Sequence, residues 1–462
     1  MVSLSRTEFQ VASQLDLTGM LKVDFFAGGG GVSCAIEDVF GDSPDYAVNH
    51  DPVAMDAHEV VHPQTTHMPE DVFKVDIRAM CKGRQVGFAW FSPDCRHFSK
   101  AKGGQPVSPR VRGLAWVMVK MARIGRPLVM CLENVEEFMT WGPCMLNEKG
   151  ETIPDPARAG ETFNKFVSIL RGLGYAVEWK VLQAADHGAP TLRQRFFLVA
   201  RCDGKAIGWP TVSHGNPRSV AASGGALKAW RTAAEILDWS IPVQSIFGRK
   251  KDLVPKSQER IAKGVLRYVL GETPFLVPSK VPELRGHEVK TAAWIVKHYS
   301  GVVGFRPESP LHTVTTVDHH GLVEVTLTPE EFADPAQAER CWAFITKFYS
   351  QGGQWAPMTD PMHTLVTKDR MMLVIVKTQG YVITDIGTRM LTADELFSAQ
   401  GFPASRRPTT ALSGKKLTHK KQVHLCGNSV PPPLAAAVIR AQLFTHHLPP
   451  ATVERSEHVS ST

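Results

Sequence analysis

LKVDFFA, at residues 21–27, runs directly into four glycines at 28–31 and then into VSCAIEDVF at 32–40, whose apolar residues have helical spacing. This order predicts a buried strand, a glycine turn and a helix. Glycine lets the backbone of such a turn approach a ligand closely, and the helix N-terminus directs N–H groups at a carboxylate or phosphate. Four glycines can equally form a flexible loop, so the stretch alone leaves cofactor binding open.

Strand-like and helix-like segments alternate along the chain after this stretch. The apolar pattern predicts strands at 46–49, 72–77, 86–91 and 127–132, helices at 111–124 and 162–173, and a closing pair of strands at 175–182 and 196–200. This alternation is typical of an α/β protein with a doubly wound, mostly parallel sheet. Ligands of such sheets bind outside the carboxyl ends of the strands.

Residues capable of chemistry stand where these strands end. Cys95 follows the strand at 86–91, and Glu133 follows the next strand, so we expect both at one edge of the sheet. Arg193 and Arg195 occupy alternate positions at the start of a strand and therefore point the same way. Each residue also has an ordinary structural explanation: a cysteine is often inert core, a carboxylate can cap a helix, and paired arginines can mark an exposed edge.

The character of the sequence changes after Trp209, where Pro and Gly become frequent and strand-like runs are short. This change predicts a second, strand-rich domain. Within it, 297–318 is echoed by 347–369, which predicts two equivalent hairpins that carry His312-Thr313 and His363-Thr364. We expect boundaries that divide the chain into 18–215, 216–385, 386–448 and a polar, disordered tail at 449–462.

Composition narrows the class of protein. Lys and Arg number 52 against 45 Asp and Glu, and the pI of about 8.9 is compatible with an anionic partner such as nucleic acid. The eight cysteines include no CxxC pair, so neither a zinc site nor a disulfide framework is indicated. No signal peptide or membrane-spanning run is recognised, which predicts a cytoplasmic protein.

Several short motifs follow one another along the chain in a fixed order. It comprises DFFAGGGG at 24–31, Cys95 in its loop, Glu133-Asn134-Val135, Arg193 with Arg195, Arg389 through QGFP at 400–403, and GNSVP at 427–431. Taken together, these segments resemble the C5-cytosine DNA methyltransferases of bacteria and their phages. The chain departs from the family pattern in having Asp94 and Arg96 around the cysteine where Pro and Gln are usual, Thr191 where Gln is usual, and Asn49 at a commonly acidic ribose position.

The resemblance implies a Rossmann-like methyltransferase sheet at 18–215, a target-recognition domain at 216–385, and a C-terminal segment at 386–448 that returns the last motifs to the catalytic domain. It implies S-adenosyl-L-methionine as the cofactor and no metal ion. The implied cofactor-binding residues are Phe26, Gly28, Gly30, Asn49, Asp51, Asp76, Ile77, Asn428 and Ser429. The ribose contact stays open between Asn49 and Asp51.

The resemblance also implies the chemistry. Cys95 would add to C6 of cytosine, Glu133 would hold and protonate N3, and Arg195, with Arg193 as its paired arginine, would stabilise the adduct. The expected partner is double-stranded DNA, bound by a monomer away from any membrane. Two alternatives remain: a relative methylates transfer RNA, and a catalytically silent homologue would only bind DNA. The long region between Thr211 and Arg389 favours duplex DNA, and the intact catalytic residues favour an enzyme.

Overall fold

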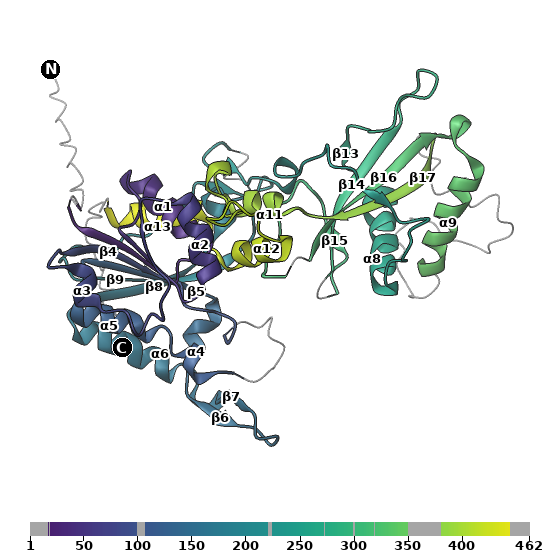
Figure 1. Cartoon of the computed structure of the whole chain (residues 1–462). Coiled ribbons are helices and arrows are strands. Elements are labelled where there is room, and N and C mark those ends of the chain that lie inside the picture. Colours follow the sequence, from purple (N-terminus) through teal and green to yellow (C-terminus); the bar gives the residue numbers. More distant parts are fainter. Residues whose placement is uncertain are drawn as a thin grey trace, which may run out of the picture. The chain divides into compact units, whose positions relative to one another are not determined.

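The computed structural model describes residues 17, 19–98, 107–219, 224–271, 273–298, 301–317, 319–349 and 380–443. The chain divides into two compact units (Figure 1). The first unit takes its residues from 1–182, 194–212 and 432–462, and the second from 183–193 and 213–431. The predicted tail at 449–462 lies outside the described residues.

The first unit is built on a seven-stranded sheet with the order β3-β2-β1-β4-β5-β9-β8. Its strands are β1 (Leu21–Phe25), β2 (Tyr46–Val48), β3 (Thr66–Met68), β4 (Val86–Phe91), β5 (Val129–Asn134), β8 (Ala176–Gln183) and β9 (Gln194–Arg201). The pairs from β3 to β5 are parallel, and β5 pairs with β9 in antiparallel fashion. This topology confirms the predicted mostly parallel α/β sheet. Strand order reverses at β1 and β4, which is where open α/β sheets bind ligands.

Helices cover both faces of this sheet (Figure 1). One face carries α1 (Gly31–Phe40), α2 (Pro52–Val61) and α13 (Pro432–Leu443). The other carries α3 (Ile77–Cys81), α5 (Trp116–Ile124) and α6 (Glu161–Gly172), with the short α4 (Pro109–Arg112) and the hairpin of β6 (Cys144–Leu146) and β7 (Thr152–Pro154) beyond. The main core lies between the sheet and the helices α3, α5 and α6 on this second face. In it, Phe25 stacks on Phe91 with ring centroids 4.9 Å apart.

Two predicted elements of the first unit are wrong. The third strand is Thr66–Met68, not 72–77, because Asp76 begins a helix instead of ending a strand. Its carboxylate accepts hydrogen bonds from the backbone N–H groups of Arg78 and Ala79, which is the bonding of an N-cap residue. The predicted helix at 111–124 is two helices, since α4 ends at Arg112 and α5 starts at Trp116.

The second unit contains a six-stranded antiparallel sheet. Its strands are β12 (Gln244–Ser245), β13 (Leu276–Val277), β14 (Lys290–Lys297), β15 (Gly304–Phe305), β16 (His320–Pro329) and β17 (Tyr381–Met390). Helices α8 (Pro255–Val265) and α9 (Pro335–Tyr349) share a hydrophobic core with this sheet around the fully buried Trp294. The unit also contains β10 (His214–Gly215), β11 (Lys228–Ala229), α11 (Ala393–Gln400) and α12 (His419–Asn428).

The two predicted copies of the internal repeat do not begin alike. Lys297 ends strand β14, whereas the corresponding Lys347 lies in helix α9. The prediction of equivalent hairpins is therefore wrong for the opening residues, because a helix-compatible run in the second copy continues α9. His363-Thr364 and the rest of that copy, at 350–369, lie outside the described residues.

Candidate active site

The loop that carries Cys95 is tied to both neighbouring strands of the first unit. Its backbone N–H at Ser92 donates to the carbonyl of Phe25 at the end of β1, at 3.3 Å. Its carbonyl at Pro93 accepts from the side-chain amide of Asn134 at the end of β5, at 3.0 Å. Cys95 itself is half-buried, whereas a core cysteine such as Cys131 is fully buried. The loop therefore presents a partly accessible thiol at the carboxyl edge of the sheet.

Asp94 and Arg96, the residues that depart from the family pattern, bond to each other across Cys95. The Arg96 Nε–H donates to Asp94 Oδ2 at 2.7 Å, and the Arg96 backbone N–H donates to Asp94 Oδ1 at 2.8 Å. Burial raises the pKa of Asp94, but the hydrogen bonds from Arg96 outweigh it and hold that pKa below its usual range. The carboxylate therefore stays charged, and its pairing with Arg96 fixes the turn around the nucleophile.

Glu133 is the second-to-last residue of strand β5 and forms a buried ion pair with Arg195. Antiparallel pairing of β5 with β9 places Glu133 opposite Phe197, so the start of β9 lies beside the end of β5. The Nε of Arg195 is 3.1 Å from Oε1 of Glu133, and their side chains are only 12% and 8% exposed. The carboxylate is therefore oriented by a fixed cation and is adjacent to Asn134, which holds the Cys95 loop.

Arg193 belongs to the second unit and has different partners. The residue is 2% exposed, and its guanidinium donates to the carbonyls of Val314, at 2.8 Å, and Gly427, at 3.0 Å. The glycine is required there, because a Cβ on Gly427 would lie 2.3 Å from the backbone of Thr315. Arg193 therefore holds three segments of the second unit together, and its predicted catalytic role remains a prediction.

The glycine turn of the first unit combines two left-handed residues with an open side. Phe26 has φ +66°, which is rare for a residue with a side chain, and Gly30 has φ +81°. At Gly28, an added Cβ would meet nothing closer than 3.9 Å. No side chain caps the start of α1, so its first N–H groups are available at the turn.

Asn49 and Asp51 connect this turn to the end of β2. The Asn49 side-chain amide donates to the carbonyl of Ala27 at 3.2 Å, and its oxygen accepts from the Asp51 backbone N–H at 2.9 Å. Asp51 in turn caps α2 by accepting from the N–H of Val53. The structure thus brings the glycine turn and both candidate ribose contacts together.

The other predicted cofactor residues occupy three environments. Asp76 is exposed and caps α3, while Ile77 is buried beside it. Asn428 and Ser429 are in the second unit at the end of α12, where Asn428 bonds to His424 and Ser429 donates to the carbonyl of Leu425.

Among the described residues, no group of His, Cys, Asp and Glu could hold a metal ion, and no helix could cross a membrane.

Sequence reasoning missed a buried polar network behind the glycine turn. Asp24 on β1 is 1% exposed and accepts from Ser33 Oγ at 2.9 Å. His58 Nε2 lies 3.0 Å from the same hydroxyl, and His58 Nδ1 lies 2.8 Å from His67 Nε2. Beside it, His62 Nδ1 lies 2.9 Å from Glu37. An acid within an apolar strand, together with histidines four residues apart on α2, was the available signal.

Asp24→Asn tests the charge state of this carboxyl. Burial, partly opposed by the hydrogen bond from Ser33, raises its pKa to about 7, whereas an unfolded aspartate ionises near pH 4. The folded chain therefore holds an extra proton between these values, and its stabilising contribution is complete below about pH 4 and lost above about pH 7. Relative to Asp24→Asn, the native free energy of unfolding should fall across this window by up to about 4 kcal/mol. Urea unfolding between pH 4 and 8 measures it, and a pH-independent difference would contradict the assignment.

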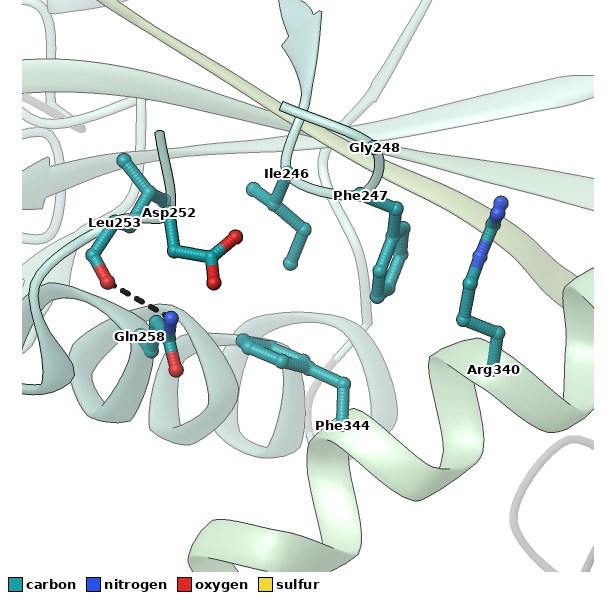
Figure 2. Close-up of a pocket in the computed structure, with 8 residues that line it drawn as sticks. All are labelled: Ile246, Phe247, Gly248, Asp252, Leu253, Gln258, Arg340 and Phe344. Carbon is teal, nitrogen blue, oxygen red and sulfur yellow. Dashed lines mark hydrogen bonds between the residues drawn. The ribbon is translucent and has the colours of Figure 1, made fainter. Parts of the chain in front are cut away.

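A cavity of about 220 Å³ lies in the second unit (Figure 2). Phe247 and Phe344 meet edge to face beside it, with ring centroids 5.9 Å apart, and Arg340 lies over the Phe247 ring. On the opposite side, Gln258 donates to the carbonyl of Leu253 (Figure 2). None of the predicted catalytic or cofactor-binding residues lines this cavity.

Comparisons with known proteins agree with the geometry of the first unit. A family model described as C-5 cytosine-specific DNA methylase matches residues 20–220. The chain is 24% identical to the Type II methyltransferase M.AquIA of Picosynechococcus sp. over 223 residues, which are 46% of this chain and 86% of that protein. It is 28% identical to M1.HphI of Haemophilus parahaemolyticus over 197 residues, which are 42% of this chain and 48% of that protein. The match thus spans about half the length of M1.HphI.

A longer match and a solved structure extend the comparison. DNA (cytosine-5)-methyltransferase 1A of Oryza sativa subsp. japonica is 24% identical over 369 residues, or 77% of this chain and 22% of that protein. The crystal structure of a Spodoptera frugiperda DNMT2 mutant superposes with a TM-score of 0.50 at 14% identity, covering 91% of this chain and 99% of that one. At this identity the structural likeness shows the fold.

Proposed function

From the premise that the chain belongs to the C-5 cytosine-specific DNA methylase family, we propose that it transfers a methyl group from S-adenosyl-L-methionine to C5 of cytosine in duplex DNA. One arrangement carries the proposal. The half-buried Cys95 and the Glu133–Arg195 pair stand at the same edge of the sheet, and Asn134 links their two segments. Such a site pairs a nucleophile with a fixed proton donor.

Cys95, Glu133 and Arg195 each have a role in the proposed methyl transfer. Cys95, as thiolate, forms a bond to C6 of the cytosine and so raises the electron density at C5. Glu133 protonates N3, and Arg195 holds Glu133 in place and offsets charge on the adduct. The bound cofactor supplies the methyl group that C5 accepts. Loss of the C5 proton to a base then restores the C5–C6 double bond and expels Cys95 as thiolate, and N3 returns its proton to Glu133 as the product is released. The target base must leave the stacked duplex to reach this edge, at a cost of roughly a few kcal/mol.

The glycine turn and the strand ends beside it fit this cofactor. The open side at Gly28 and the uncapped start of α1 suit the amino-acid part, because backbone N–H groups there can bind a carboxylate. Asn49 and Asp51 supply polar groups for the ribose, and Asp76 with Ile77 suits the adenine. Phe26 and Gly30 shape the turn through their positive φ angles. The proposal also includes Asn428 and Ser429 of the second unit.

Asp76 allows capping to be separated from cofactor binding. Its carboxylate caps α3, and an exposed cap is worth about 1 kcal/mol. Asp76→Asn keeps a capping oxygen but loses the charge that would accept from the adenine amino group, so we expect weaker cofactor binding, by about fivefold, at near-native stability. Asp76→Ala should lose both. Calorimetric titration with S-adenosyl-L-methionine and thermal unfolding measure the two effects. Equal affinity of native protein and Asp76→Asn would exclude the adenine contact.

The strand-rich second unit is the proposed site of sequence recognition. Residues 216–385 include its antiparallel sheet as far as the middle of β17, and His312 and Thr313 precede strand β16. Short polar side chains can read base edges in a groove. Exchange of 216–385 for the matching region of a relative should change which cytosines are methylated in cells, as bisulfite sequencing reports. An active chimera with the native methylation pattern would place recognition elsewhere.

A single assay tests the proposed function against its rivals. The purified protein is incubated with methyl-labelled S-adenosyl-L-methionine and either duplex DNA or transfer RNA, and the label is located by nucleoside analysis. We expect 5-methylcytosine in the DNA only. Label in transfer RNA alone would establish the RNA enzyme, and no label despite DNA binding would establish a silent homologue. Action on cellular or phage DNA would place the reaction in the bacterial cytosol.

A further inference from the structure

His58 of α2 and His62, which caps the end of that helix, pack against the glycine turn. An added Cβ at Gly30 would lie 2.9 Å from His62 Nε2 and 3.4 Å from His58 Cδ2. Both rings therefore pack against Gly30 and leave no room there for a side chain. Both rings are fully buried in the first unit. A movement of either ring would be transmitted directly to the backbone of the turn.

Burial keeps the His58 ring neutral, and both of its ring nitrogens have hydrogen-bond partners. Burial, followed by the neighbouring His62 and His67, lowers its pKa well below the usual range, so the ring is neutral, with one donor and one acceptor nitrogen. Ser33 donates its hydroxyl proton to Asp24, His58 Nε2 lies 3.0 Å from the same hydroxyl, and His58 Nδ1 lies 2.8 Å from His67 Nε2. These hydrogen bonds thus connect β3 through α2 and α1 to β1.

His62 makes a second set of contacts with α1, beside those of His58. His62 Nε2 lies 3.7 Å from Sγ of Cys34, and its Nδ1 bonds to Glu37, both on α1. Glu37 also accepts from Ser43, which follows α1. The two histidines therefore connect α2 to successive turns of the helix that the glycine turn begins. Ordinary apolar packing would give α1 no such directional connection.

We propose that His58 is a positioning residue for the cofactor site, which holds Gly30 and, through Ser33, the buried Asp24 so that the glycine turn is preformed for its ligand. This inference rests on the proposed function, because it takes the turn as the S-adenosyl-L-methionine site. His58 acts through Ser33 and the turn and does not touch the cofactor. Its loss should therefore weaken cofactor binding while the chemistry at Cys95 and Glu133 continues.

Three variants separate positioning from general stability. His58→Leu removes both hydrogen bonds, and Ser33→Ala removes the link to Asp24 with a minimal change of volume. His58→Gln retains one donor and one acceptor and should restore binding. Val61→Ala, at a buried position on the same helix, is the control, because it lowers stability without altering the network. Calorimetry with S-adenosyl-L-methionine, kcat at saturating cofactor and thermal unfolding are measured for each.

We expect the cofactor Kd to rise about tenfold in His58→Leu and about fivefold in Ser33→Ala, the size of lost buried hydrogen bonds, with kcat nearly native. His58→Gln should stay within about threefold of the native Kd, and Val61→Ala should bind normally. Native affinity in Ser33→Ala, or equal weakening in Val61→Ala at the same loss of Tm, overturns the inference. Failure of the native protein itself to bind the cofactor overturns the proposed function instead.

Discussion

Cys95→Ser should abolish methyl transfer, with a loss of at least about a thousandfold in kcat, because a serine hydroxyl is a far weaker nucleophile than a thiolate towards C6 of cytosine. The loop should be unaffected, since its bonds from Ser92 to Phe25 and from Asn134 to Pro93 involve no atom of the cysteine side chain. Cofactor affinity should therefore remain native. Labelled methyl transfer to duplex DNA measures the loss, and calorimetry measures the affinity.

A mechanism-based substrate gives the same experiment a second readout. Duplex DNA with 5-fluorocytosine at the target cannot lose its C5 substituent, so the native protein should remain bonded to it through Cys95 and migrate with the DNA under denaturing conditions. Cys95→Ser should not. Cys202→Ser is the matched control, because Cys202 is also half-buried but donates to the carbonyl of Pro127 and lies away from the loop. Undiminished trapping by Cys95→Ser would assign the nucleophile elsewhere.

The edge of the sheet where Cys95 and Glu133 lie could be predicted from the sequence because its determinants are local. Strand β4 ends at Phe91, as the apolar run indicated, and the loop begins at the proline that ends sheet pairing. Glu133 and Cys95 then share an edge because parallel strands end together. The prediction of the third strand at 72–77 was wrong. The apolar residues before Asp76 suggested a strand, but the cap that Asp76 provides for α3 outweighed that preference.

Other features depend on contacts between distant residues, which periodicity does not reveal. Arg193 and Arg195 alternate in sequence, yet one bonds to carbonyls more than a hundred residues away in the second unit and the other to Glu133. The network from Asp24 to His67 draws on two strands and two helices. Apart from Asp24, its residues belong to none of the recognised motifs, so only tertiary structure brings them together. The prediction of two equivalent repeat copies likewise fails at Lys347, where helix α9 continues.

Glu133→Gln should lower kcat by about a hundredfold to ten-thousandfold, the range that general acid–base catalysis contributes. An amide cannot deliver a proton to N3, so the adduct of Cys95 at C6 would form with its charge uncompensated. Glutamine retains an oxygen that can accept from Arg195, which is 3.1 Å away in the native protein, so the fold and the Cys95 loop should persist. Single-turnover methylation of duplex DNA measures the loss.

The structure supplies a close control and a sharper readout for this variant. Glu136→Gln changes the same chemical group three residues further along, where the side chain is exposed, and should leave kcat native. Glu133→Gln should also slow the trapping of 5-fluorocytosine DNA, because protonation at N3 assists the addition of the thiolate and not only the methyl transfer. Trapping at the native rate would confine Glu133 to a later step. A kcat within about tenfold of native would remove it from the acid–base role, because that loss is smaller than acid–base catalysis supplies, and would leave the ion pair with Arg195 as a structural element of the sheet edge.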